Sequence, residues 1–404
     1  MTKKLSTDSA TLVEQKQLDV DRILLDLGWH GKYQSLIYFL SNATWIFVAI
    51  QILIITFNAA NPPFRCGVAN TTVEEQLTTD HNSSSFGLNY SGVFDSQCSV
   101  PVFDSNETQS CRSIDEAEFI YDADFGSTIV SEWNLICGLF EETLASTAGS
   151  LYMVGVFVGA FVIPPFADQY GRRKAFLGSL WAAIPCALGV SFAPNYTMFI
   201  ILRFALGCVF SGVVVVSWVV CCEIVVSKYR SYAGILGSIA WVTGYILLDI
   251  CAYFFRDWRR LHFVVAVPLF IFISFYWLMP ESIQWLASKG KNKEAIAEIK
   301  RACRMNNKTL EIDSYFTVIP QSDDKEKNLI GNLRSLIGSR LLLFHTVAMC
   351  YLWFCDSGIY YGLSLYSTEL TADRYLSFGL SGLVELPAYV LISFFVQWYF
   401  LIAI

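Results

Sequence analysis

The stretch Ala167-Asp168-Gln169-Tyr170-Gly171-Arg172-Arg173-Lys174 joins two apolar runs, residues 145–165 and 175–193. Each run is close to the ~20 residues that a helix needs to cross a bilayer. Three consecutive cations directly after the glycine place this short turn on the cytoplasmic side by the positive-inside rule. The stretch therefore predicts a helical hairpin whose turn faces the cytoplasm. A generic basic turn that only sets topology is the alternative to a functional loop.

The composition extends this prediction to the whole chain. Apolar residues make up 54% of the 404 residues, charged residues only 16%, and the mean hydropathy is +0.46. Soluble domains average about 25% charged residues, so a soluble core is excluded. The sequence predicts an all-α polytopic membrane protein. Its eight apolar spans lie near residues 37–58, 145–165, 175–193, 198–222, 234–255, 261–279, 341–363 and 376–400.

The distribution of charge predicts the orientation. If the N-terminus is cytoplasmic, only six of the 28 Lys and Arg residues fall in external segments, and Arg203 lies inside the fourth span. Both termini are therefore predicted in the cytoplasm. The first apolar run begins only near residue 37 and is long enough to span, so no cleavable signal peptide is expected. The net charge of −7 reflects the acidic external segment rather than a basic or nucleic-acid partner.

That external segment, residues 59–144, is too polar to enter lipid. It carries four cysteines and four glycosylation sequons, which is typical of a secretory-pathway loop with two disulfides. The sequence leaves all three cysteine pairings open, and free thiols are the alternative. The cysteines are Cys66, Cys98, Cys111 and Cys137, and the sequons are at Asn70, Asn82, Asn89 and Asn106.

Residues 1–36 form the predicted cytoplasmic N-terminal segment. Within it, Ile23, Leu24 and Leu27 fall on one face of a short helix. An amphipathic helix of this kind is expected to lie on the inner surface of the membrane.

Four motifs resemble those of known transporters. The Asp-x-x-Gly-Arg-Arg at residues 168–173, between the second and third spans, resembles the signature loop of the major facilitator superfamily. Residues 280–286 resemble the Pro-Glu-Ser-x-Arg-Trp-Leu motif of its organic cation, anion and carnitine transporter family, with Gln284 in place of Arg. Residues 28–34 and 125–137 resemble the entry to helix one and the end of the external loop in the same family.

The resemblance implies a major facilitator fold, with twelve helices in two halves of six and the substrate held between the halves. The chain would then comprise the N-terminal half plus helices seven and eight, truncated after helix eight. The implied segments are a cytoplasmic start (1–36), helix one (37–58), the external loop (59–144), helices two to six (145–280), a cytoplasmic loop with amphipathic helices (281–340), and helices seven and eight (341–404).

The resemblance also implies an ionic lock at the cytoplasmic end. In the family, charges near the ends of helices four and six meet the signature loop, whose Asp also meets helix eleven of the second half. Plain interfacial charge is the alternative. Gln284 removes one partner from this lock. The implied gating and signature-loop residues are Asp168, Gly171, Arg172, Arg173, Glu223, Arg230 and Glu281.

Three acids inside predicted spans, Asp249, Asp356 and Glu385, suggest a substrate site. Intramembrane carboxylates are costly and mark functional sites by default. Carboxylates beside aromatic faces bind organic ammonium groups, and each ring contributes about 0.5–2 kcal/mol through cation–π attraction. Glu385 is the leading candidate ligand, and its pairing with Arg203 or a backbone group is the alternative. The other candidates are Trp353, Asp356, Tyr360 and Tyr361.

The resulting hypothesis is a multi-pass plasma-membrane carrier of small organic cations or zwitterions such as carnitine, working by alternating access without a cofactor. Two alternatives remain: an organic anion carrier of the same family, and a non-transporting truncated variant or surface scaffold. No enzyme is expected, because the four histidines form no metal-ligand spacing and no nucleophile arrangement is recognisable. Beyond the substrate, the lipid bilayer is the expected partner.

Overall fold

The structure is a computed structural model, and it describes residues 15–28, 31–68, 98–101, 108–110, 117–226, 230–319, 338–369 and 373–403. Eight helical segments within these ranges are long and apolar enough to cross a membrane. They overlap the eight apolar spans predicted from the sequence. The helices are α2 (Lys32–Leu53) continued by α3 (Ile55–Asn58), α5 (Leu139–Tyr170), α6 (Arg172–Ser191), α7 (Tyr196–Ile224), α8 (Arg230–Phe254), α9 (Trp258–Ala266) continued by a 3₁₀ stretch (Val267–Ser274) and α10 (Phe275–Leu278), α14 (Arg340–Tyr366), and α15 (Arg374–Ala403).

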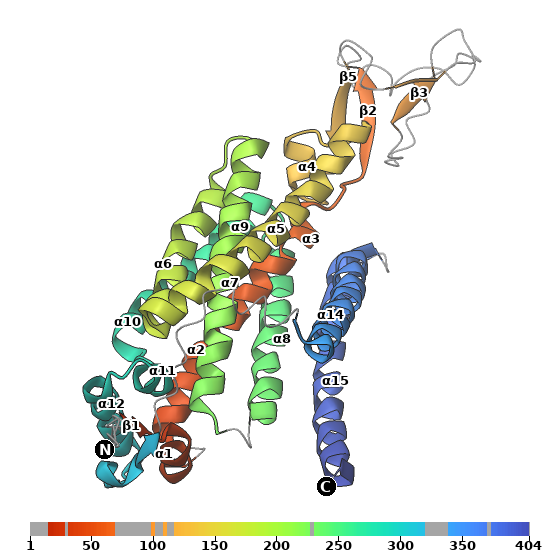
Figure 1. Cartoon of the computed structure of the whole chain (residues 1–404). Coiled ribbons are helices and arrows are strands. Elements are labelled where there is room, and N and C mark those ends of the chain that lie inside the picture. Colours follow the sequence, from red (N-terminus) through yellow and green to blue (C-terminus); the bar gives the residue numbers. More distant parts are fainter. Residues whose placement is uncertain are drawn as a thin grey trace, which may run out of the picture.

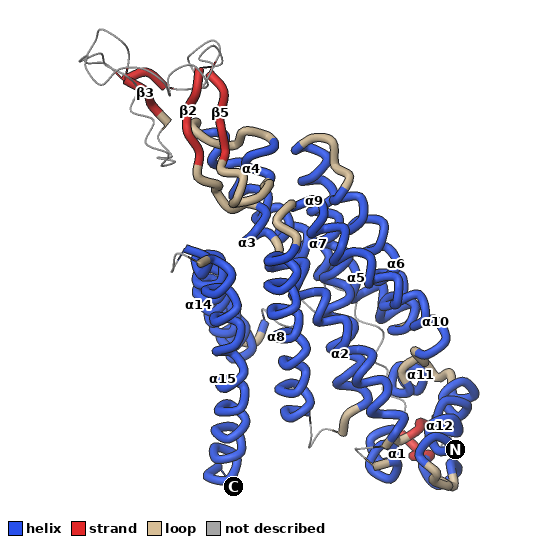
Figure 2. The backbone as a smooth tube through the Cα atoms, turned by 180° about the vertical axis from the view of Figure 1, so that it is seen from behind, coloured by secondary structure: helices blue, strands red, loops and turns tan. Residues whose placement is uncertain are grey.

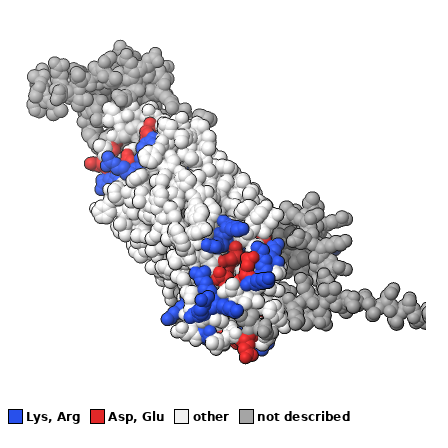
Figure 3. Space-filling model, turned by 90° about the vertical axis from the view of Figure 1, so that its left-hand side faces the viewer, with Lys and Arg blue, Asp and Glu red and all other residues white. Residues whose placement is uncertain are grey.

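These helices form a bundle, with α14 and α15 together on one side of it (Figure 1). Several of them are apolar around their whole circumference, as expected of helices surrounded by lipid and by each other. On the face shown in Figure 3, charged side chains gather toward the two ends of the molecule and leave a broad uncharged band between them. This distribution fits the all-α membrane fold.

Small residues let α5 and α7 approach closely. A Cβ on Gly155 or Gly159 would meet a backbone oxygen of α7 at 2.2 Å, and one on Gly207 would meet the Tyr152 oxygen at the same distance. Because lipid provides no hydrophobic drive between helices, close backbone packing of this kind holds membrane helices together. α5 also continues without a break through Pro164 and Pro165.

α15 packs against α8 and the end of helix one through aromatic rings. Phe378 is fully buried, stacks on Tyr245 of α8 at 4.2 Å and meets Phe57 of α3 edge-on at 4.8 Å. Tyr375, one turn away, stacks on Phe57 at 5.7 Å. We call Phe57, Tyr245, Tyr375 and Phe378 the external aromatic contact, because they lie at the end of the bundle that carries the loop after helix one.

That loop is partly described. β2 (Phe64–Val68) pairs antiparallel with β5 (Ala117–Tyr121), and β3 (Ser99–Pro101) with β4 (Thr108–Ser110). Cys98 and Cys137 are joined in the structure. The four sequon asparagines, Cys111 and the side chain of Cys66 lie outside the described residues.

A short helix anchors the end of this loop to the bundle. Glu132, at the end of α4 (Ile129–Glu132), accepts from Trp258 Nε1 at 2.7 Å and forms a salt bridge with Arg259 at 2.5 Å. Trp258 is buried and also donates its backbone N–H to Ser127. The start of α9 therefore binds the loop end through both side-chain and backbone contacts.

The end of the bundle predicted to face the cytoplasm contains a small subdomain that the sequence did not predict. α1 (Val20–Leu27) packs beside α11 (Ile283–Ser288) and α12 (Asn292–Asn306), and β1 (Gln15–Leu18) pairs with β6 (Phe316–Ile319) after a 3₁₀ turn (Ile312–Tyr315). These elements lie together below the bundle (Figure 2).

The prediction that this short helix lies on the inner surface of the membrane is wrong, because α1 packs against the rest of the protein instead. Ile23, Leu24 and Leu27 do share one face of α1, but they are at most 2% exposed and pack within the protein. Polar contacts fix this position: the Tyr315 hydroxyl donates to Asp26 at 2.6 Å, and Asn306 Nδ2 donates to the Leu27 carbonyl at 3.4 Å. The partners are almost 300 residues away in sequence, so amphipathicity alone could not distinguish protein from lipid as the covering surface.

Candidate functional site

The candidate substrate site centres on Glu385, within α15. Its Oε1 accepts a hydrogen bond from the Tyr360 hydroxyl of α14 at 2.8 Å, and its Oε2 accepts from Tyr389, one turn along α15, at 3.2 Å. The Tyr360 hydroxyl in turn accepts from Trp241 Nε1 of α8 at 2.8 Å. The bonds from Trp241 through Tyr360 to Glu385 therefore connect α8 with α14 and α15.

This arrangement places a carboxylate next to aromatic surface. Hydrogen bonds to an ionised acceptor are about twice as strong as neutral ones, and a carboxylate has about four acceptor positions, more than these two bonds occupy. The rings of Trp241 and Tyr360 lie 6.4 Å apart, and those of Tyr360 and Tyr361 lie 5.4 Å apart, edge to face. An organic ammonium is the ligand that such a combination of charge and π-faces attracts.

The other predicted site residues are less closely grouped. Asp356 lies one turn before Tyr360 on α14, is exposed, and acts electrostatically on Tyr389. Trp353 is 64% exposed, and among the described residues neither a ring contact nor a hydrogen bond joins it to Glu385. Asp249 on α8 faces α15, where a Cβ on Gly379 would lie 2.5 Å from its Oδ2. Glu385, Tyr360 and Tyr361 are thus together, and Trp353 is apart.

Arg203 does not take the role considered for it. Its guanidinium is fully buried, donates from Nη1 to the Gln51 carbonyl at 2.9 Å, and lies 4.5 Å from the centre of the Tyr152 ring. The pairing of Arg203 with Glu385 is therefore absent from the structure. Within the described residues, Nε and Nη2 of Arg203 have no hydrogen-bond partner.

At the end predicted to face the cytoplasm, the structure brings the predicted charged residues together. Arg172 binds Asp168 of the preceding turn and donates from Nε and Nη2 to Glu223 Oε1 of α7, at 3.1 and 3.0 Å. The side chains of Arg172 and Glu223 are only 13% and 15% exposed. A charge pair so shielded from water is worth more than a surface pair.

The turn before α11 and the Trp285 side chain of α11 bind the signature loop. Glu281 Oε1 accepts from the backbone N–H of Arg173 at 3.0 Å, close to the N-terminus of α6, where a negative charge is stabilising. Trp285 Nε1 donates to the Asp168 carbonyl at 2.9 Å. Gly171 has φ +115°, and a Cβ there would lie 2.3 Å from Glu281 Oε2, so the loop requires glycine.

We call Asp168, Arg172, Arg173, Glu223 and Glu281 the cytoplasmic lock. Arg173 contributes through Nη2, which donates to the Tyr276 carbonyl at 2.5 Å. Gln284, which replaces the Arg of the related motif, has a buried Oε1 without a hydrogen-bond partner among the described residues. The side chain of Arg230 lies outside the described residues.

No metal centre accompanies these sites in the part of the chain that the structure describes: no three His, Cys, Asp or Glu side chains are grouped to hold an ion.

Comparison with known proteins identifies the family. The family described as "Sugar (and other) transporter" matches residues 84–400. The "Organic cation transporter protein" of Drosophila melanogaster is 31% identical over 93% of this chain and 70% of its own length. The chain belongs to the organic cation, anion and carnitine transporter family of the major facilitator superfamily. The human "Organic cation/carnitine transporter 2" is 30% identical over 94% of this chain and 71% of its own length.

A solved structure supports the fold. A major facilitator proton:xylose symporter with bound 6-bromo-6-deoxy-D-glucose superposes with a TM-score of 0.54 over 89% of this chain and 68% of its own, at 14% identity. The chain is therefore a multi-pass membrane transporter and, like its family, not an enzyme.

Two residues of the candidate site, Tyr389 and Trp241, were not identified from the sequence. Tyr389 had a readable signal, because a residue four positions after Glu385 on a helix lies on the same face. Trp241 had none, because its partner Tyr360 is 119 residues away in the chain.

Proposed function

We propose that this chain carries small organic cations or carnitine-like zwitterions across the plasma membrane by facilitative alternating access. The observation that carries the proposal is the Glu385 carboxylate, held by Tyr360 and Tyr389 inside an apolar span at the contact between α8 and α15. The ammonium of the substrate binds this carboxylate against the rings of Trp241, Tyr360 and Tyr361. An inside-negative potential draws a cation inward with about 2.3 kcal/mol per charge per 100 mV.

The names of two relatives support this substrate class. The Drosophila and human proteins are named as organic cation and organic cation/carnitine transporters. In this chain, Asp356 adds negative charge one turn from Tyr360, and Trp353 completes the site when the halves rearrange. The cytoplasmic lock then acts as the gate on that side.

The external loop and the topology complete the proposal. Both termini face the cytoplasm, and the loop after helix one is glycosylated at Asn70, Asn82, Asn89 and Asn106. Cys66 and Cys111 form a second disulfide beside that of Cys98 with Cys137. Release of N-linked glycans by an endoglycosidase should change the mobility of the protein, and substitution of all four asparagines should abolish that change.

The test of transport is uptake of labelled tetraethylammonium into cells that express this chain. We expect uptake to rise with a more negative membrane potential and to fall by at least about tenfold in Glu385→Gln, because a charge-assisted contact worth at least ~1.4 kcal/mol is lost. Glu294→Gln, an exposed acid on cytoplasmic α12, is the matched control and should leave uptake unchanged. Uptake by cells with the unmodified chain that is no higher than uptake with Glu385→Gln would contradict the carrier proposal and favour a non-transporting surface protein.

A further inference from the structure

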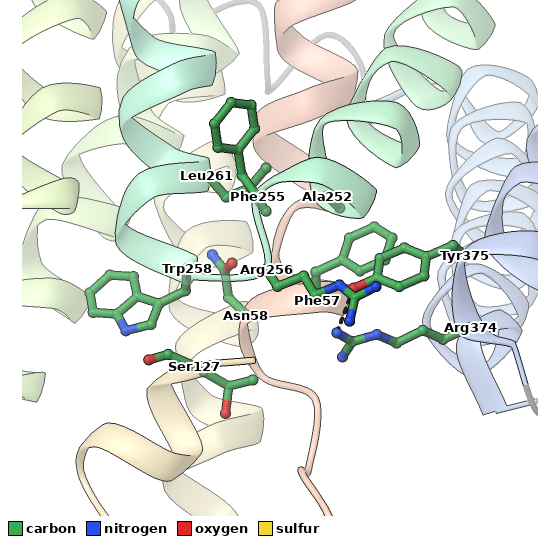
Figure 4. Close-up of a pocket in the computed structure, with 11 residues that line it drawn as sticks. Phe57, Asn58, Ser127, Ala252, Phe255, Arg256, Trp258, Leu261, Arg374 and Tyr375 are labelled. Atoms are coloured by element: carbon green, nitrogen blue, oxygen red, sulfur yellow. Dashed lines mark hydrogen bonds between the residues drawn. The ribbon is translucent and has the colours of Figure 1, made fainter. Parts of the chain in front are cut away.

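A small pocket lies at the external end of the bundle, where α15 meets the loop end and the end of α8 (Figure 4). Two arginines line it: Arg256, directly after α8, and Arg374, at the start of α15. Rings of Phe57, Trp258 and Tyr375 form part of its wall. The pocket is separated from Glu385 by the external aromatic contact, since Phe378 lies between Arg374 and Glu385 along α15. It is therefore distinct from the candidate substrate site.

The two guanidinium groups lie close together. Arg256 Nη1 donates to the Asp124 carbonyl at 3.0 Å, and Arg374 Nη2 donates to the next carbonyl, that of Phe125, at 2.6 Å. Consecutive residues are only about 3.8 Å apart along the chain, so cations bound to neighbouring carbonyls are near neighbours. The Phe125 ring fixes the position further, because the Arg374 guanidinium lies 3.9 Å from its centre.

Neither arginine forms an ion pair within the described residues. No salt bridge found there includes Arg256 or Arg374. The nearest acids in sequence cap helices: Asp257 accepts from the Arg260 N–H at 2.9 Å, and Asp373 from the Tyr375 N–H at 3.0 Å. Moreover, Nη1 of Arg374 is buried and has no hydrogen-bond partner among the described residues.

We propose that Arg256 and Arg374 form a binding site for a carboxylate group at the external entrance, and that an occupied site holds α15 against the loop end. A planar carboxylate matches the fork of a guanidinium and accepts two parallel hydrogen bonds. One arginine precedes the first-half helix α9 and the other begins α15, so a shared anion removes their repulsion and bridges the two halves. The carboxylate comes either from a free organic acid or from a zwitterionic substrate at the entrance.

The test is calorimetric titration of the purified protein at low ionic strength, because salt screens exposed charges. Benzoate provides a carboxylate alone, and trimethylglycine provides a carboxylate with an ammonium. We expect Arg374→Gln and Arg256→Gln each to weaken benzoate binding about tenfold, as the loss of one charge-assisted contact implies. Arg260→Gln, an exposed external arginine that is not among the pocket-lining residues, is the matched control and should bind benzoate as the unmodified protein does.

Two further results separate the outcomes. Glu385→Gln should keep benzoate affinity even if it abolishes tetraethylammonium uptake, so failure of the transport proposal leaves this site intact. If trimethylglycine binding weakens in Arg374→Gln as benzoate binding does, the site accepts a zwitterionic ligand; if only benzoate binding depends on Arg374, its ligand is a free acid. Equal benzoate affinity in Arg256→Gln, Arg374→Gln and the unmodified protein, or an equal loss in Arg260→Gln, would overturn the proposal.

Discussion

The two ends of the bundle are stabilised by different chemistry. The cytoplasmic lock uses carboxylate–arginine pairs and joins α5, α6, α7 and the turn before α11, where the long loop begins. The external aromatic contact uses stacked rings and joins α15 to α3 and α8 across that loop. Ion pairs thus stabilise one half internally, whereas stacked rings, together with hydrogen bonds from Trp241 to Tyr360 and from Arg374 to Phe125, link α14 and α15 to it. Stacked rings can separate and repack without leaving an unpaired buried charge, which suits a contact that opens in the proposed transport cycle.

The largest effect is expected at the external aromatic contact. Phe378→Ala removes a fully buried ring that touches both Tyr245 and Phe57, and should lower the free energy of unfolding by about 3 kcal/mol. Thermal unfolding of the purified protein measures the loss. Phe395→Ala, on the same helix but 63% exposed, is the control and should be nearly neutral. Similar losses in both variants would mean that the contact does not hold α15.

The next effect tests the turn of the cytoplasmic lock. Gly171→Ala forces a side chain into φ +115° and against Glu281, and should cost about 2–3 kcal/mol of stability. Gly178→Ala is the matched control on α6, where a Cβ meets nothing within 4 Å and alanine favours the helix by up to about 1 kcal/mol. A neutral Gly171→Ala would show that the loop adopts another conformation.

The ionic part of the lock is expected to contribute less. Glu223→Gln keeps the shape of the side chain but leaves Arg172 with Asp168 as its charged partner, at a cost of about 2 kcal/mol in unfolding free energy. The control is Glu294→Gln on exposed α12. An effect no larger than that of the control would assign Glu223 to ordinary interfacial charge.

The smallest effect concerns pH. Burial raises the pKa of Glu298 on α12, and the nearby Glu281 raises it further, against the opposing influence of Arg301 and Arg173. A raised pKa in the folded state means that the charged form is disfavoured there, so Glu298 costs stability as pH rises from its unfolded pKa to its folded one. Glu298→Gln should therefore stabilise slightly above that window, by less than about 0.5 kcal/mol because solvent screens the half-buried group, and make no difference at lower pH. A stabilising effect at low pH alone would contradict this.

The comparison of the two ends also shows what sequence could predict. The signature loop, Glu223 and Glu281 were found because family motifs contain them, and the helices were found because lipid imposes length and apolar composition. The external aromatic contact was not found, because Phe57, Tyr245 and Phe378 are ordinary apolar residues until packing brings them together. Arg374 was classed only as an external cation, since its partner Phe125 is 249 residues away.

The substrate site was predicted only in part. Glu385 was predicted because a carboxylate in lipid is costly, and Tyr360 was predicted as part of an aromatic stripe. Trp353 was also predicted, but the structure leaves it exposed, since the sequence cannot show which face of α14 meets its neighbours. Trp241, which fixes Tyr360, lies on another helix and has no local signal.

The central claim is that Glu385 binds the ammonium group of the substrate with support from Tyr360. Direct titration of the purified protein with tetraethylammonium tests it most closely. We expect the dissociation constant to rise at least about tenfold in Glu385→Gln and less in Tyr360→Phe, which loses one hydrogen bond to the carboxylate but keeps the charge and the ring. Unchanged tetraethylammonium affinity in Glu385→Gln would contradict the account.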